Sequence, residues 1–252
     1  MNDAWIRTLQ NRTCVAVCMK KSSVFPGLAA RWFAAFSLLF GSTLPAAAQA
    51  VLIDEGTFEH FVGEQRVGTE TFTIHRVGLG ADAELLANGS VEQSDRRLTP
   101  ALKTRSDLTP TSYQVAVSGA SARQLSIVLG GPRYASRSTG PEGEVQREYR
   151  AGPGTTVLEE GIAHQFYFVA RGPSEPGNRL LVIRPLDGRQ VPLRFTSSTR
   201  ENLRWGREVV STLHVSFDLD GAQYELWADD EGRVLRVTRP ADGWRAERVP
   251  VR

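Results

Sequence analysis

Cysteine is nearly absent from this 252-residue chain, and its two cysteines, Cys14 and Cys18, both lie close to the N-terminus. The rest of the chain therefore has no thiol with which to form a disulfide bond. A zinc site beyond residue 18 would have to use histidines and carboxylates alone. The spacing of the two cysteines carries no metal-binding or redox meaning if this segment is removed.

A hydrophobic run long enough to span a bilayer is also missing. The apolar run at residues 32–40 is much shorter than the roughly 20 residues that a membrane-spanning helix needs. It follows Lys20 and Lys21, and the small residues Ala48-Gln49-Ala50 come after it. A basic start, a short apolar run and a small-residue site form the pattern of a secretory signal peptide.

We therefore predict a signal peptide over residues 1–50, cleaved after Ala50, and a single exported β-domain over residues 51–252. Met19 is a second candidate start, which would make residues 1–18 an over-extended reading of the gene. The expected location is the periplasm or the extracellular space. No cysteine stands at the cleavage point, so lipid attachment there is excluded.

Lysine is scarce as well, because Lys103 is the only lysine after residue 50. The whole chain has 30 basic and 28 acidic residues. Without the five basic residues and one acidic residue of the first 50, 25 basic residues face 27 acidic residues, a net charge of −2. The arginines alternate with acids rather than clustering, which argues against a nucleic-acid-binding protein.

Motifs of common enzymes are missing too. The sequence has no G-x-S-x-G, no H-E-x-x-H and no phosphate-binding loop, and residues 78–82 (GLGAD) lack the third glycine of a dinucleotide fingerprint. We therefore predict no catalytic residue, no cofactor and no metal ligand. A zinc site stays open only if histidines that are far apart in the sequence converge with a carboxylate. These histidines are His60, His75, His164 and His214.

Short runs of alternating apolar and polar residues dominate what is present. In residues 113–119, for example, Tyr113, Val115 and Val117 fall on one face. Roughly ten to twelve strands of about 5–9 residues, separated by turn residues, indicate an all-β protein. We expect a single strongly curved antiparallel sheet or open β-barrel. Residues 138–144 and 171–178 are the longest predicted loops.

One segment has helical spacing instead. Ile162, Phe166 and Val169 recur at helical intervals within residues 159–172, and a glycine and a proline follow. The segment predicts one short helix, with a buried strand as the alternative because short apolar runs fit both.

The C-terminal part reads as a three-stranded meander with turns at residues 218–221 and 229–232. The expected cross-strand rows on the apolar face are Val215–Tyr224–Val237 and Leu213–Leu226–Leu235. On the other face, His214, Glu225 and Arg236 would form a row. That row could orient a general base, but a cross-strand charge ladder is the simpler interpretation.

The acidic triplet Asp229-Asp230-Glu231 is interpreted as a hairpin turn rather than a calcium loop. If Gly221 or Gly232 stood at the glycine position of an EF-hand, the closing glutamate would fall on Trp227 or Thr238. Neither residue can supply the bidentate carboxylate, so we predict no metal here.

Aromatic residues are the remaining lead. A curved sheet closed by a helix can enclose an apolar cavity, although small barrels are more often filled by their own side chains. The predicted ligand-binding residues all belong to this apolar face: Phe58, Phe72, Phe166, Tyr224, Leu226 and Leu235.

Two stretches carry a resemblance to known proteins. Residues 58–74 (FEHFVGEQRVGTETFTI) run through Gly63, Val67 and Gly68, and residues 224–240 (YELWADDEGRVLRVTRP) join a Leu-Trp strand to an acidic turn. Together they resemble exported bacterial proteins of unknown function and, more distantly, the periplasmic LolA/LolB-like lipoprotein carriers. The resemblance implies a curved sheet around a helical plug, with an apolar concave face for acyl chains.

These observations favour an exported, non-enzymatic binder or carrier of an apolar ligand, such as a lipid or a lipoprotein acyl chain, in the cell envelope. The alternative is a structural or interaction module of the envelope with a filled core and no ligand. An enzyme of unknown type is the third hypothesis. A cavity of several hundred Å³ would distinguish the first hypothesis from the second.

Overall fold

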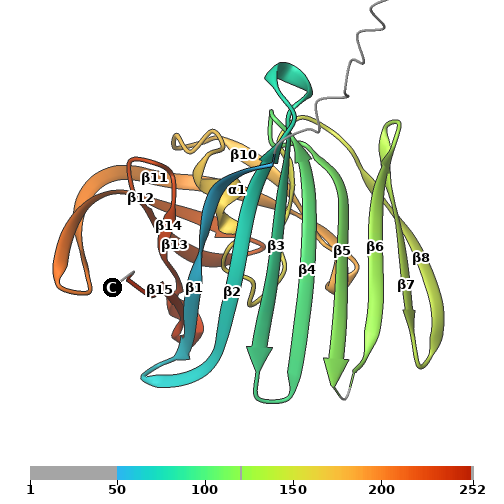
Figure 1. The fold of residues 1–252 in the computed structure, drawn as a ribbon, viewed down its shortest axis with the longest axis horizontal. Helices are drawn as coiled ribbons and strands as arrows, with labels where there is room; N and C mark the ends of the chain where they lie inside the picture. Colours follow the sequence, from blue (N-terminus) through green and yellow to red (C-terminus); the bar gives the residue numbers. More distant parts are fainter. Residues whose placement is uncertain (1–49, 120, 251–252) are drawn as a thin grey trace, which may run out of the picture. The chain divides into compact units, whose positions relative to one another are not determined.

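A computed structural model describes residues 50–119 and 121–250, which form one curved sheet of fifteen strands around a single short α-helix (Figure 1). This confirms the predicted all-β class and the curved open sheet, and it exceeds the predicted ten to twelve strands. The strands are β1 Val51–Val62, β2 Gln65–Val77, β3 Glu84–Gln93, β4 Arg96–Arg105, β5 Pro110–Gly119, β6 Arg123–Gly130, β7 Arg133–Gly140, β8 Gly143–Arg150, β9 Thr155–Val157, β10 Arg179–Arg184, β11 Arg189–Trp205, β12 Glu208–Leu219, β13 Ala222–Ala228, β14 Val234–Arg239 and β15 Trp244–Arg248.

The strand order places the first and last strands side by side in the middle of the sheet. Strands β1 to β8 extend from β1 in one direction, and β15 back to β9 extend in the other. Neighbours are antiparallel except for the parallel pair β9–β10. The edge strand β8 is bonded to β11 near the other edge, where the Gln190 side chain accepts from the backbone N–H and donates to the C=O of Arg150, at 3.0 and 2.7 Å. The sheet is therefore barrel-like, with side-chain bonds across its seam.

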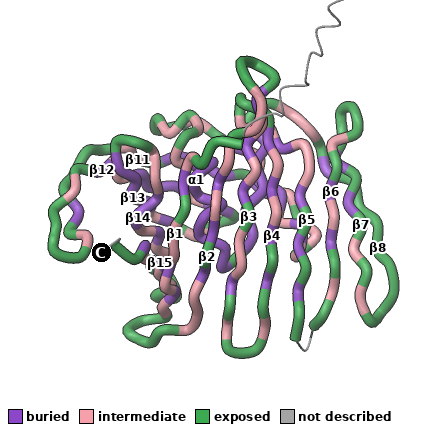
Figure 2. The backbone as a smooth tube through the Cα atoms, in the orientation of Figure 1, coloured by how far each residue is buried: buried purple, intermediate pink, exposed green. Residues whose placement is uncertain are grey.

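Alternation along the strands builds a buried inner face. On β2, Glu70, Phe72 and Ile74 are buried, while the residues between them are more exposed. Figure 2 shows buried and exposed positions alternating in this way along the neighbouring strands. The period of two thus directs every second side chain toward the concave side, where the chain's own residues 158–170 lie.

The helix α1 spans Phe166–Ala170, so the predicted helix over residues 159–172 is confirmed in its second half only. Every residue from Phe166 to Val169 is buried, because the sheet surrounds this segment. It is the one α-helix among residues 50–119 and 121–250, and no helix there is long and apolar enough to cross a membrane.

The two predicted loops have different outcomes. Residues 171–178 form an irregular connection as expected. Residues 138–144 do not, since β7 and β8 continue to Gly140 and from Gly143 and leave a tight hairpin. The proline and glycine residues predicted the position of this turn correctly, but the predicted loop was longer than the observed two-residue turn.

The register of the C-terminal meander differs from the prediction by two residues. Asp220 and Gly221 alone form the first turn, with φ of 57° and 84°, as in a type I′ hairpin. Phe217 therefore lies opposite Tyr224, and Val215 opposite Leu226. A shift of two residues keeps each side chain on its predicted face, whereas a shift of one would have inverted the strand.

The strand pairing next to the second turn contains an irregularity that moves one side chain to the other face of the sheet. The side chain of Asp229 accepts hydrogen bonds from the backbone N–H groups of Glu231 and Arg233, which confirms the predicted acidic turn. Beyond it the pairing shifts between Trp227 and Ala228, as in a β-bulge. The extra residue is Leu235, which turns away from the inner face.

The type I′ turn makes a prediction. Substituting Gly221→Ala places a Cβ at a positive φ and should lower the free energy of unfolding by about 1 kcal/mol. Urea unfolding followed by tryptophan fluorescence measures this. The control is Gly130→Ala in another hairpin, where φ is not left-handed and the nearest atom to a new Cβ is 4.0 Å away. Equal losses in both variants would contradict the assigned turn type.

Candidate functional site

Five of the six predicted ligand-binding residues come together in the interior. Phe58 and Phe72 stack with ring centroids 5.4 Å apart, and Phe166 packs against Tyr224 at 5.9 Å. Leu226 belongs to the same buried cluster. Strands β1, β2 and β13 and helix α1 supply these side chains, so the predicted apolar face exists. Ligand binding by these residues stays a prediction.

Leu235 was placed on the wrong face. It packs with Leu203 and Trp227 in a separate small cluster on the other side of the sheet. The bulge in β14 causes this, because one inserted residue reverses the alternation that the prediction used.

The predicted row of His214, Glu225 and Arg236 is also wrong. His214 pairs with Trp227 and stacks on its ring at 4.4 Å, while Trp227 pairs with Arg236. The carboxylate beside His214 is that of Glu201, 3.3 Å from Nδ1. The two-residue shift in register moves Glu225 out of this row.

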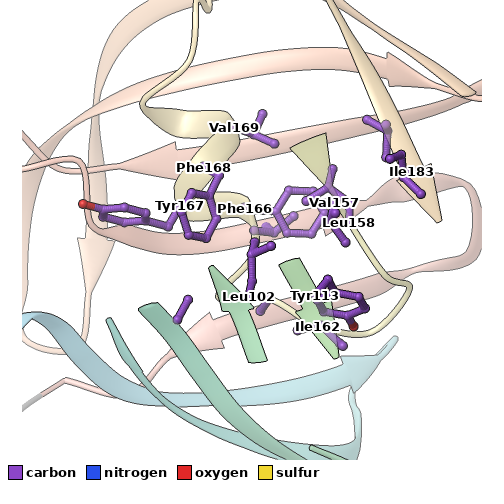
Figure 3. Packing of buried hydrophobic residues seen from close by; sticks show 14 of the residues in the cluster. Leu102, Tyr113, Val157, Leu158, Ile162, Phe166, Tyr167, Phe168, Val169 and Ile183 are labelled. Atoms are coloured by element: carbon purple, nitrogen blue, oxygen red, sulfur yellow. The ribbon is translucent and has the colours of Figure 1, made fainter. Parts of the chain in front are cut away.

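The concave side of the sheet is filled by the chain itself. Residues 158–170, named the plug below, contribute Leu158, Ile162 and the helix to the core. Figure 3 shows them lying against side chains of the sheet that include Leu102 and Tyr113. The space left beside Phe166 and Tyr224 is about 10 Å³, room for one water molecule at most.

One buried carboxylate holds the plug to the sheet. Glu70 on β2 accepts hydrogen bonds from the backbone N–H groups of Ala163 and His164, at 2.6 and 2.7 Å. The ring nitrogens His164 Nδ1 and His60 Nε2 lie 2.7 and 3.1 Å from the same carboxylate. Because an ionised carboxylate only accepts, both ring nitrogens must carry a proton.

The charge of Glu70 is maintained by these partners. Complete burial alone raises its pKa, but the hydrogen bonds and charges of His164 and His60 outweigh burial and lower the pKa to about 2. Four donors therefore replace the water that the carboxylate loses. This arrangement, named the Glu70 latch below, fixes the plug in one position.

The sequence analysis missed the Glu70 latch. The sequence feature that could have revealed it is Glu70 itself, a carboxylate that alternates with polar residues in step with Phe72 and Ile74 and so lies on the same inner face. A second signal is Gly89, since a Cβ there would lie 2.7 Å from Cε1 of His164. Glycine at this point lets the imidazole approach the strand.

A second buried carboxylate, Glu159, stands at the start of the plug in a different environment. Burial raises its pKa to about 8, although the backbone N–H of Leu186 donates to it at 2.8 Å. Nearby Asp187 raises the pKa further. Glu159 is therefore protonated at neutral pH, unlike Glu70.

A buried ion pair joins the first and last strands. The guanidinium of Arg248 donates to both oxygens of Asp54, at 3.0 and 2.6 Å, and also to the carbonyl of Glu55. Gly56 leaves room for it, because a Cβ there would lie 3.1 Å from the guanidinium. The guanidinium also covers the ring of Phe72. This pair reinforces the β1–β15 junction on which the strand order depends.

An open cleft lies where the plug meets the end of the sheet. Its volume is about 380 Å³, and it is named the rim cleft below. Apolar side chains from β1, β3, the β2–β3 and β4–β5 connections and α1 form most of its wall, together with two arginines. The lining residues are Ile53, Arg76, Leu79, Gly80, Ala83, Leu85, Ser106, Leu108, Tyr167 and Arg171.

The histidines do not build a metal centre in the described part of the chain. His60 and His164 meet at Glu70, but residues 50–119 and 121–250 contain no group of three or more His, Cys, Asp and Glu residues that could hold a metal ion.

Comparisons with known proteins support the fold. No family model matches the chain, and no curated protein does. A solved structure from Brucella abortus, a β-barrel-like protein with a domain of unknown function DUF1849, is similar over 82% of this chain and 98% of its own. Its TM-score is 0.50 and its identity 10%, so the likeness concerns the fold alone. A DUF1089 family protein from Pseudomonas aeruginosa matches 69% of this chain and 90% of its own, with a TM-score of 0.40 and 15% identity.

The Glu70 latch predicts a large loss of stability in Glu70→Gln, about 2–3 kcal/mol at pH 7, because the histidine N–H groups lose a charged acceptor. The exposed control Glu92→Gln, whose partner is Arg97, should change stability by less than about 0.5 kcal/mol. Because the pKa of Glu70 is lowered in the folded state, its ionised carboxylate stabilises the fold fully above pH 4.5, the ordinary pKa of the group. This stabilisation is lost as the pH falls through about 2. The difference between wild type and Glu70→Gln should therefore be constant above pH 4.5 and shrink toward pH 2 in urea unfolding. A difference independent of pH would contradict an ionised Glu70.

Glu159 predicts the opposite pH dependence. Its pKa is raised, so the unfolded chain releases a proton above pH 4.5 that the folded chain keeps until about pH 8. Folding stability is lost over that interval. Glu159→Gln cannot ionise and should be more stable than wild type by up to about 3 kcal/mol at pH 7, with the gain vanishing near pH 4.5. Unfolding curves at pH 5 and pH 8 measure this, and a gain equal at both pH values would rule out a neutral Glu159.

Proposed function

We propose that this chain is an exported, non-enzymatic binder of an apolar ligand in the cell envelope, with the ligand held in the rim cleft. The rim cleft carries the proposal. It is open and mostly apolar, and its volume of about 380 Å³ falls within the range of small-molecule sites. The resemblance of residues 58–74 and 224–240 to periplasmic lipoprotein carriers suggests an acyl chain as the ligand.

The rim is a better candidate than the interior, which was the expected site. The plug occupies the concave side, and three hydrogen-bond contacts from Ala163 and His164 to Glu70 hold it there. A ligand inside the sheet would have to displace this buried network. The rim cleft needs no such rearrangement, and Tyr167 of the plug forms part of its wall.

One exposed side chain supports an apolar ligand at this position. Leu79 is 86% exposed, at the β2–β3 connection beside the cleft. Ile53 and Leu108 add further partly exposed apolar surface. Contiguous apolar surface around a cleft is typical of a binding site.

The second candidate is an interaction or structural module of the envelope without a ligand. The filled interior favours it, because the buried cluster extends from β2 through the plug to β13 with little space between side chains. Binding at the rim cleft distinguishes the two candidates.

A displacement assay with a fluorescent acyl probe tests the proposal. Leu79→Asp should weaken binding at least tenfold, because it places a charge in the apolar wall. The variant should still fold normally, because Leu79 is 86% exposed in a loop. The matched control Val209→Asp changes another exposed apolar residue, 62% exposed on β12 and outside the rim cleft, and should bind as wild type does. No binding by wild type, or equal losses in both variants, would favour the ligand-free module.

Export makes a separate prediction. The protein recovered from the periplasm or medium should begin at Val51, and Ala50→Phe should accumulate as uncleaved precursor because cleavage sites require small residues. N-terminal sequencing measures both. Recovery of an intact chain beginning at Met1 or Met19 would contradict export through this segment.

A further inference from the structure

The charge around the rim cleft is of one sign. Two of its ten lining residues are arginines, Arg76 and Arg171, and none of the ten is acidic. Arg76 has the same inward parity on β2 as Phe72 and Ile74, so it stands at the open end of the buried row. It lies opposite Leu85, an apolar lining residue, in the β2–β3 register.

Arg171 is already held in place. Its guanidinium covers the ring of Tyr167 at 5.3 Å and donates to the carbonyl oxygen of Glu231 at 2.9 Å. A guanidinium has five N–H donors, and this bond uses one of them. Positioned guanidinium groups bind carboxylates and phosphates with two parallel hydrogen bonds.

Leu108 supplies an independent observation. Its φ of 68° is in the left-handed region, which glycine or asparagine normally occupies. The tight β4–β5 connection imposes this conformation, with Leu108 N–H bonded to Arg105 O and Thr109 N–H bonded to the side chain of Asp107. A leucine here is unfavourable for the turn, and backbone strain of this kind concentrates at functional positions.

The side chain of Leu108 stands between two spaces. It lines the rim cleft and also a second cleft of about 230 Å³, whose wall includes Phe168 and Leu180. Arg171 lines both clefts as well. An apolar side chain and a guanidinium therefore stand together at the boundary of the two.

We infer that the ligand is a single-chain anionic amphiphile, whose carboxylate or phosphate pairs with Arg171 and Arg76 and whose chain packs on Leu108. This inference rests on the proposed function and narrows it. Two arginines in a lining that contains no carboxylate favour an anion over a neutral lipid. A single chain fits the volume of the rim cleft better than the several chains of a lipoprotein anchor would.

The experiment compares three probes in the same displacement assay: a C14 fatty acid, the matching fatty alcohol and a lysophospholipid with an anionic headgroup. The fatty acid should bind at least tenfold more tightly than the alcohol. Arg76→Gln and Arg171→Gln should each weaken binding of the fatty acid more than binding of the alcohol, and so remove most of that difference. The control Arg207→Gln, in the exposed β11–β12 turn, should keep the wild-type difference.

The outcomes separate the inference from the proposed function. Equal binding of acid and alcohol would overturn the anionic head and leave an apolar binder. Failure of all three probes would overturn both. Tighter binding of the lysophospholipid than of the fatty acid would identify a phosphate headgroup as the source of the charge, and the reverse order a free carboxylate.

Leu108→Gly separates binding from folding. It should weaken binding of all three probes at least fivefold, while the melting temperature stays equal or rises because glycine relieves the left-handed strain. A lowered melting temperature with unchanged binding would show that Leu108 serves core packing and would overturn its role in the ligand site.

Discussion

A single buried carboxylate determines how the interior of this sheet is filled. Glu70 accepts two backbone and two imidazole hydrogen bonds, and all four come from groups that would otherwise be buried without a partner. The free energy of leaving any of them unpaired is comparable to a substantial part of a protein's net stability. The plug consequently has one position, and the shape of the rim cleft follows from it, because Tyr167 lies three residues beyond His164.

The plug begins at a carboxylate of opposite character. Burial raises the pKa of Glu159 to about 8. The pKa of Glu70 is instead lowered to about 2, because its hydrogen-bond donors outweigh the effect of burial. The difference comes from the number of partners, four against one backbone N–H from Leu186. A short segment is thus fixed firmly in its middle and less favourably at its start.

The sequence predicted what depends on local pattern. The alternation of apolar and polar residues correctly predicted the all-β fold class and the inner face of the sheet. The helical spacing of apolar residues around Phe166 correctly predicted the short helix. The register of the meander was wrong because an Asp-Gly pair can close a turn of two residues as well as end one of four. The face of Leu235 was wrong because a bulge adds a residue that alternation cannot reveal. The Glu70 latch joins residues 94 positions apart, and nothing local to either end specifies the other.

The same contrast between local pattern and tertiary packing explains why the candidate site lies at the rim and not in the interior. The aromatic residues that suggested a ligand are those that a curved sheet needs for its own core, because a segment so short as the plug can be buried only by surrounding it with large side chains. Leu108 differs from these residues, since it has an unfavourable backbone conformation in its turn and is only partly buried against the core. Residues that lower the stability of the fold at their own position are more often functional than residues that raise it. The rim cleft, where a strained leucine and two arginines line a mostly apolar wall, therefore carries more information about function than the larger and better packed interior.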